Sequence, residues 1–205
     1  MIRKGEPWGS GASGPPDVEI EGSDADLARS VVPGRPARLV GYRPSADADL
    51  ARAVGLTPGS PATTELTIDA LEVAGRTAVN AVVFGVAPDR IARWTRRHPV
   101  EVAIDGRSAW SGSAAGIVVA NGQFVRGLDL VPRGHPGDGR LEVQVYAVPP
   151  GERAAMRRRL ATGTHVPHPR ILERSGCVVE IDGVLRGHER SLRVAVLPGA
   201  LKILV

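Results

Sequence analysis

The sequence predicts an α+β protein, in which a short α/β portion is followed by a β-sandwich with one or two helices. Residues 17–56 alternate between strand-like and helical patterns. After residue 64, most segments are short, alternate apolar with polar residues and end at turn residues, as strands do. Hydrophobic residues make up 42% of the chain but aromatic residues only 3%, so the core must consist of aliphatic side chains.

The first portion follows a strand–helix–strand–helix order. Residues 17–22 and 37–42 predict strands, and residues 24–32 and 45–56 predict amphipathic helices. Residues 1–16 are rich in Gly, Ser and Pro and are expected to be irregular. This order is typical of an α/β unit.

A Pro- and Gly-containing segment at residues 57–64 marks the expected domain boundary. We predict an α/β portion at 1–60 and a β-sandwich domain at 61–205. Helical patterns interrupt the second part at 87–98 and 151–163. The other segments of this part predict strands: 65–75, 77–87, 100–112, 114–122, 128–132, 140–148, 177–185, 192–199 and 200–205.

Several dipeptides mark tight turns between these strands. Asp105 and Asp182 each precede a glycine directly after a strand-like run. Asn121-Gly122 is a strong turn signal in its own right. We therefore predict hairpin turns at Asp105 and Asp182 and a turn at Asn121-Gly122.

Composition excludes some functional classes. Few aromatic side chains are available for base stacking, and no recognition-helix or zinc pattern occurs, which argues against nucleic-acid binding. Arg93, Arg96 and Arg97 beside Trp94, and the arginines at 157–159, predict solvated surfaces, with anionic lipid head groups as the alternative partner. The single cysteine excludes an internal disulfide. No apolar run reaches the ~20 residues needed to span a bilayer, and the first residues lack an apolar signal segment, so we expect a cytoplasmic protein.

The most specific pattern lies at residues 116–147, with the sequence GIVVANGQFVRGLDLVPRGHPGDGRLEVQVYA. It reads as a strand, an Asn-Gly turn, a second strand, a proline, a loop that closes at Asp-Gly, and a third strand. This order resembles the second-domain signature of the diacylglycerol kinase family, which includes bacterial lipid kinases and ceramide and sphingosine kinases. Flanking segments fit the same family, so the resemblance covers about 67–205.

The resemblance implies that a first domain binds ATP with Mg²⁺, and that a lipid enters the cleft between this domain and a β-rich second domain. In the family, a Gly-Gly-Asp-Gly-Thr loop cradles nucleotide phosphate, and a carboxylate takes the proton of the lipid hydroxyl. Carried over residue by residue, the resemblance assigns these roles: catalytic, Asp24 and Asp138; nucleotide-binding, Gly22, Asp24 and Asp49; substrate-binding, Asn121 and Gly122; metal-binding, Asp138 and Glu142.

Several residues depart from the family pattern where the chemistry would occur. Ser23, Ala25 and Asp26 stand where the family has Gly, Gly and Thr. Asp26 places a negative charge where a hydroxyl group would meet phosphate, and like charges repel. Gly137 replaces the first carboxylate of an Asp-Asp-Gly motif, and Val184 replaces the glutamate of Asp-Gly-Glu. Valine can neither accept a proton nor bind Mg²⁺.

These departures favour a degenerate lipid-kinase-like protein with weak or no ATP-dependent phosphotransfer, acting in lipid binding or as a regulatory partner. One alternative is an active ATP-dependent lipid kinase, and another is a protein-interaction module. The family's elements that precede the glycine loop have no room in residues 1–16, so the first domain is expected to be truncated. A homodimer or a partner chain would then cover exposed sheet edges.

Overall fold

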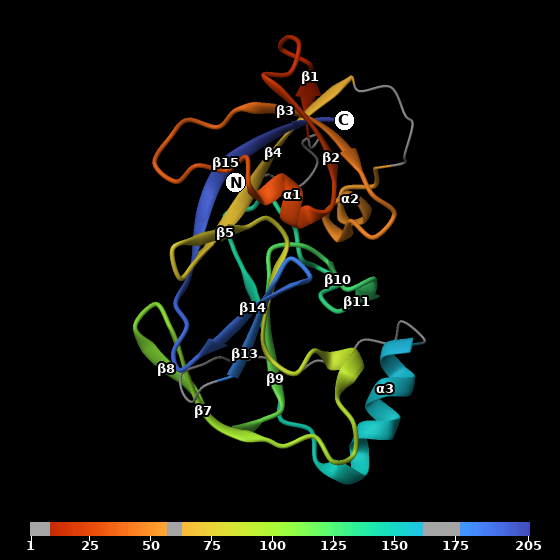
Figure 1. Ribbon diagram of the computed structural model, residues 1–205, viewed down its shortest axis with the longest axis vertical. Coiled ribbons are helices and arrows are strands. Elements are labelled where there is room, and N and C mark those ends of the chain that lie inside the picture. Colours follow the sequence, from red (N-terminus) through yellow and green to blue (C-terminus); the bar gives the residue numbers. More distant parts are fainter. Residues whose placement is uncertain (1–8, 57–62, 162–176) are drawn as a thin grey trace.

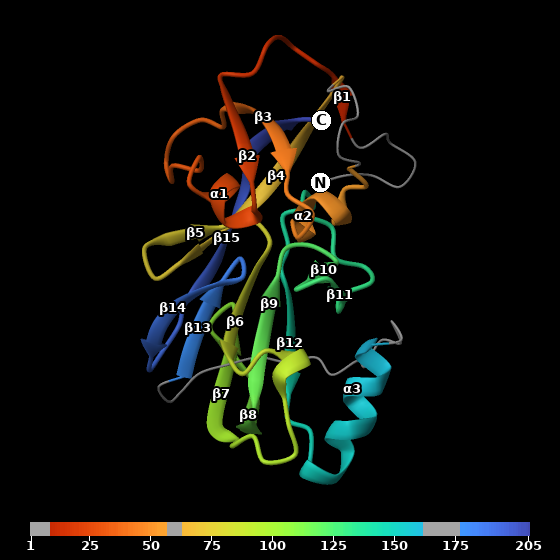
Figure 2. The same cartoon turned by 45° about the vertical axis from the view of Figure 1, so that its right-hand side comes forward.

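The computed structural model describes residues 9–56, 63–161 and 177–205. Figures 1 and 2 show two strand-rich lobes stacked along the long axis, with three short helices at their periphery. The strand-rich α+β class expected from the sequence is confirmed. Most of the expected linker at 57–64 and the Gly-His-His-Pro segment of the family pattern at 163–169 lie outside the described residues.

The upper lobe in Figure 1 contains a mixed sheet with the strand order β1-β4-β15-β3-β2, to which β5 is added beside β4. β3 runs parallel to both β2 and β15, whereas β15 is antiparallel to β4. Three of these strands come from the second part of the chain, so the sheet combines both expected parts, and the division at residue 60 stays a prediction. The strands are β1 (Ser10–Gly11), β2 (Val18–Gly22), β3 (Leu39–Pro44), β4 (Thr64–Val73), β5 (Arg76–Ala78) and β15 (Val194–Leu204).

Two five-residue helices, α1 (Asp24–Ala28) and α2 (Asp49–Ala53), cover this sheet. Both are shorter than expected. Helix α1 already ends at Ala28, and Gly55, with φ +73°, follows the end of α2. Their apolar residues join those of the sheet in an aliphatic core that includes the fully buried Leu27, Val40, Leu50, Ile68 and Ile203.

The lower lobe is built on a five-stranded antiparallel sheet with the order β12-β9-β6-β13-β14. One face packs against a β-hairpin formed by β7 and β8, and the other lies beneath the small β10–β11 hairpin and α3. The core therefore occupies both faces of this sheet. The elements are β6 (Ala81–Gly85), β7 (His98–Ile104), β8 (Arg107–Ala114), β9 (Gly116–Ala120), β10 (Phe124–Val125), β11 (Leu128–Asp129), β12 (Glu142–Tyr146), η2 (Pro150–Glu152), α3 (Arg153–Ala161), β13 (Cys177–Ile181) and β14 (Val184–Glu189).

The expected helix at 87–98 is wrong. Only a single 3₁₀ turn forms there, η1 (Pro88–Arg90), and β7 begins at His98. The hydroxyl of Thr95 accepts the Ala92 N–H at 2.8 Å, and this bond closes a turn where a helix would have continued. The helix expected at 151–163 is confirmed as α3 over its described part. No helix within the described residues is long and apolar enough to cross a membrane.

Candidate functional site

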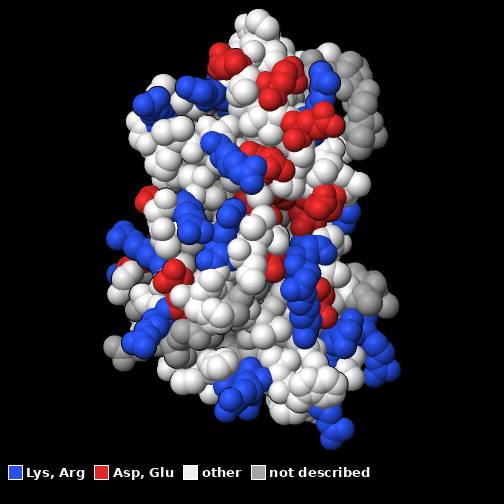
Figure 3. Space-filling view, in the orientation of Figure 1, with Lys and Arg blue, Asp and Glu red and all other residues white. Residues whose placement is uncertain are grey.

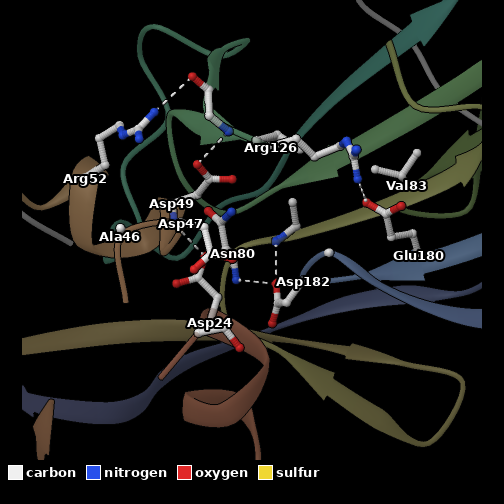
Figure 4. A pocket seen from close by; sticks show the side chains of 15 residues that line it. Asp24, Ala46, Asp47, Asp49, Arg52, Asn80, Val83, Arg126, Glu180 and Asp182 are labelled. Atoms are coloured by element: carbon white, nitrogen blue, oxygen red, sulfur yellow. Dashed lines mark hydrogen bonds and ion pairs between the residues drawn. The ribbon is translucent and has the colours of Figure 1, made fainter. Parts of the chain in front are cut away.

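A cavity of about 410 Å³ lies where the two lobes meet (Figure 4). Its walls come from the start of α1, the loop into α2, α2 itself, β6, the β10–β11 turn and the β13–β14 turn. The sequence thus brings residues about 160 positions apart into one site. The lining residues are Ser23, Asp24, Ala46, Asp47, Asp49, Arg52, Asn80, Ala81, Val83, Val125, Arg126, Gly127, Glu180, Asp182 and Gly183.

Asp24 is buried at the start of α1 and caps α2 with its side chain. Its Oδ2 accepts hydrogen bonds from the backbone N–H groups of Asp49 and Leu50, both at 3.0 Å. The Tyr42 hydroxyl donates to Oδ1 at a longer distance of 3.4 Å. Burial, together with the nearby Asp182 carboxylate, raises the pKa of Asp24 to about 7. The carboxyl group therefore changes charge near neutral pH while it holds the two helices of the upper lobe together.

Asp182 lies in the β13–β14 turn, as expected, with a left-handed φ of +46°. Its side chain also accepts hydrogen bonds from a second segment of the chain, which the turn pattern did not predict. Oδ2 accepts the Val79 N–H at 2.8 Å, and Oδ1 accepts the N–H groups of Asn80 and Ala81 at 3.0 and 2.8 Å. Burial raises the pKa of Asp182 to about 6 even though these hydrogen bonds favour the charged form. Asp182 thus fastens the turn to the start of β6, on the cavity wall.

Asp49 and Arg52 of α2 hold the β10–β11 turn of the other lobe. Asp49 Oδ1 accepts the Gly127 N–H at 2.8 Å, and the Arg52 guanidinium donates to the Gly127 carbonyl at 3.0 Å. The same guanidinium lies 5.6 Å from the centre of the Phe124 ring, in cation–π range. Burial raises the pKa of Asp49. Asp49, which the family resemblance assigns to nucleotide binding, therefore makes a contact between the lobes, as does Arg52.

Arg126, the second arginine of the cavity, is held by two carboxylates. Its guanidinium donates to Glu180 at 2.8 Å and to Asp89 at 3.0 Å. Because Arg52 also has partners, neither arginine of the lining presents an unengaged guanidinium. Carboxylates outnumber arginines in the lining, so the cavity disfavours anionic groups unless a cation accompanies them.

The expected substrate-binding residues Asn121 and Gly122 lie behind the cavity wall and not in its lining. The Asn121 side chain is fully buried and donates to the carbonyls of Asp69 and Val79 at 2.8 and 3.0 Å. Asn80 does line the cavity. Its Nδ2 donates to the Phe124 carbonyl at 3.1 Å, and its buried Oδ1 has no partner among the described residues.

The loop that would cradle phosphate is occupied by the chain's own carboxylate. Asp26 Oδ2 accepts the Ser23 N–H at 2.9 Å and the Ser23 hydroxyl at 2.7 Å. These hydrogen bonds lower the pKa of Asp26, whose other oxygen pairs with Arg29. A Cβ atom at Gly22 would lie only 2.4 Å from Asp26 Oδ2, so the carboxylate packs directly on the loop. A nucleotide phosphate needs such N–H donors, and in this loop the Ser23 N–H is already engaged.

Asp138 and Glu142, the expected metal ligands, lie near one another but outside the cavity lining, so the cavity does not combine Asp24 with Asp138. Asp138 Oδ1 accepts the Arg140 N–H at 3.0 Å. Burial and the Asp138 charge raise the pKa of Glu142 to about 7, and its buried Oε2 lacks a partner within the described part of the chain. Two carboxylates do not complete the oxygen shell of Ca²⁺, whereas Mg²⁺ is commonly held by one or two carboxylates together with water and substrate phosphates, so the assignment of these two residues to a metal stays a prediction. Among the described residues, no group of three or more His, Cys, Asp or Glu side chains could hold a metal ion.

Comparison with known proteins places this geometry in context. The model of the family described as "YegS C-terminal NAD kinase beta sandwich-like domain" matches residues 74–205. No curated protein sequence matches the chain.

Solved structures share the fold. A diacylglycerol kinase from Bacillus anthracis str. Sterne superposes with a TM-score of 0.73 at 15% identity, covering 92% of this chain and 77% of that chain. A candidate diacylglycerol kinase from the same organism gives 0.70 at 18% identity, covering 92% and 76%. Yeast NADH kinase complexed with NADH gives 0.51 at 12% identity, covering 92% and 61%. At these identities the likeness concerns the fold alone.

Proposed function

The chain belongs to the YegS C-terminal NAD kinase beta sandwich-like domain family, and from this premise we propose that it is a lipid-kinase-like protein that binds a lipid without phosphorylating it. Its fold is that of diacylglycerol kinases and NAD kinases. The proposal concerns what the cavity between the lobes accepts. The cavity would bind the hydroxyl-bearing head group of a neutral lipid and would not bind a nucleotide.

The observation that carries the proposal is the position of Asp26. Its carboxylate already holds the Ser23 N–H, and it packs against Gly22 where a phosphate would have to approach. An incoming phosphate would meet a like charge at this point and would find that donor already engaged. ATP with Mg²⁺, which the family resemblance implies, therefore has no suitable loop in this fold.

The polar lining supports a neutral ligand with hydroxyl groups. Carboxylates accept hydrogen bonds from hydroxyls, and the unpartnered Oδ1 of Asn80 is a further acceptor. A diacylglycerol presents one hydroxyl and carries no charge. The electrostatic penalty that opposes a phosphate at this cavity does not apply to it.

The test is to measure nucleotide and lipid binding separately. We expect no heat of ATP binding at millimolar ATP and Mg²⁺ in calorimetry, but saturable binding of a short-chain diacylglycerol. The triple variant Ser23→Gly, Ala25→Gly, Asp26→Thr restores the family's loop sequence and should gain ATP binding, with circular dichroism to show that it folds. ATP binding by the unaltered chain would overturn the exclusion of nucleotide. Absence of diacylglycerol binding would overturn the lipid assignment.

One observation favours an active lipid kinase as the second candidate. The pKa of Asp24, about 7, suits a general base at neutral pH. This candidate requires transfer of labelled phosphate from ATP to diacylglycerol, and loss of that transfer in Asp24→Asn. If this chain transfers no phosphate under conditions in which a known diacylglycerol kinase phosphorylates the same vesicles, this candidate is excluded.

A further inference from the structure

Trp94 is the most exposed large apolar side chain among the described residues, at 84% of its full accessibility. It lies between η1 and β7 in a tight turn. The Thr95 N–H donates to the Ala92 carbonyl at 3.1 Å, and the Thr95 hydroxyl accepts the Ala92 N–H at 2.8 Å. An indole held in solvent on such a turn gains nothing from the core of the protein. It is therefore a candidate contact to a partner.

A buried arginine of α3 holds this turn through hydrogen bonds. The Arg153 side chain is only 2% exposed, and its guanidinium donates to the carbonyls of Ala92, Arg93 and Thr95 at 2.9, 2.7 and 2.8 Å. These three acceptors flank Trp94 on both sides. The backbone of the turn is thus fastened to α3, which fixes the point at which the Trp94 side chain leaves the chain.

Exposed arginines surround the indole in the sequence and on the neighbouring helix. Arg93, Arg96 and Arg97 are exposed on the same loop, and Arg157 is exposed one helical turn after Arg153, on the same side of α3. We call these four residues with Trp94 the arginine face. In Figure 3, the lower end of the molecule, where α3 lies, shows basic side chains and no acidic ones on the visible surface. Of the nearby carboxylates, that of Asp89 is bound to Arg126, and that of Glu152 is exposed.

We propose that the arginine face docks the protein on an anionic membrane surface. Arginine binds phosphate groups through its planar fork of donors, and tryptophan is the side chain most suited to the boundary between head groups and acyl chains. A single-stranded nucleic acid would need a series of aromatic side chains for base stacking, and the face has one. The face lies outside the cavity, so this proposal does not depend on what the cavity binds.

Vesicle flotation of the full chain tests the proposal. We expect binding to phosphatidylcholine vesicles that contain phosphatidylglycerol, weak binding to phosphatidylcholine alone, and loss of binding at high salt. Each arginine near the surface should contribute about fivefold to partitioning, so Arg96→Ala with Arg97→Ala should weaken it by about 25-fold. The control is Arg35→Ala with Arg38→Ala, which removes the same charge from the exposed loop at the opposite end.

Trp94→Ala separates the indole from the charge. It should weaken binding to anionic vesicles without changing the thermal midpoint, because the side chain packs against little of the protein. Equal losses in the Arg96/Arg97 and Arg35/Arg38 variants would show that only net charge matters and would overturn the proposal. Equal binding to neutral and anionic vesicles would overturn it as well, and so would tighter binding to single-stranded DNA than to the vesicles at the same salt concentration.

Discussion

Asp26 Oδ2 lies 2.9 Å from the backbone nitrogen of Ser23 and also accepts the Ser23 hydroxyl. A helix N-terminus attracts an anion, because its first N–H groups lack partners within the helix. In this chain the anion is a side chain of the helix itself. One carboxylate therefore stabilises α1 and at the same time removes a position where an external phosphate could bind.

Asp26→Ala should lower the free energy of unfolding, because the variant loses the hydrogen bonds from Ser23 that complete the capping box of α1. Urea unfolding followed by circular dichroism measures this difference. Glu21→Ala is the matched control, because it removes one negative charge from an exposed position on the adjacent strand. An equal loss in both variants would mean that net charge, and not the hydrogen bonds to Ser23, accounts for the effect.

The raised pKa of Asp24 predicts a pH dependence with a definite sign. The folded state keeps this proton up to about pH 7, whereas an aspartate with the ordinary pKa of 3.8 has released it well below that. Between these values the folded state binds more protons than the unfolded state, so its stability falls as pH rises. Asp182 and Glu142, with pKa values raised to about 6 and about 7, act in the same direction.

Asp24→Asn isolates the contribution of that carboxyl group. The amide oxygen can still accept the two N–H groups of α2, but it cannot ionise. As pH rises from about 5 to about 8, the variant should become more stable relative to the parent. Guanidinium unfolding across this range measures the difference, with the exposed Asp47→Asn as the reference for a charge change on the neighbouring loop. A difference that does not vary with pH would contradict the raised pKa.

Arg153 should be among the most sensitive residues of the lower lobe. Its guanidinium serves three carbonyls of the Trp94 turn and one of Val148. Replacement by Met removes all four hydrogen bonds, after which the Ala92 carbonyl keeps only the Thr95 N–H, and we expect a loss of about 2–4 kcal/mol in chemical unfolding. Arg157→Met, at an exposed position one turn later, should cost less than about 0.5 kcal/mol. Similar losses in both variants would show that the hydrogen bonds of Arg153 do not stabilise the fold.

Alternation and turn residues are local signals, and they predicted the strand-rich fold. The family was predicted from the resemblance of residues 116–147 to its second-domain signature. The sequence also indicated Asp24 and Asp49, which the structure does place in one cavity. The lining residues Asn80, Arg126 and Glu180 were missed, since none belongs to a recognisable local motif. Asn80 and Glu180 come together because β6 pairs with β13 in the lower sheet, and Arg126 reaches Glu180 from the β10–β11 turn. Periodicity reports neither contact.

The incorrect helix at 87–98 has a similar origin. Its residues have adequate helical periodicity, but Arg153, far away in the sequence, binds the carbonyls at 92, 93 and 95 that a helix would use internally. A tertiary contact thus overrides the local preference. Strand and helix patterns could not reveal it, because the partner is more than fifty residues away.

Asp182 shows what a local turn signal leaves out, and a paired substitution can measure it. Asp182 and Asp105 both occur as Ile-Asp-Gly at a hairpin, with φ values of +46° and +49°. Asn tolerates this conformation as well as Asp does, so Asn substitution leaves the turn itself unchanged. At Asp182, however, the new amide nitrogen would face one of the three N–H groups at 79–81, where only an acceptor fits. We expect Asp182→Asn to cost about 1–3 kcal/mol in chemical unfolding and Asp105→Asn, on an exposed hairpin, almost nothing. Equal effects would mean that the hydrogen bonds from the N–H groups at 79–81 to the Asp182 side chain do not contribute to stability.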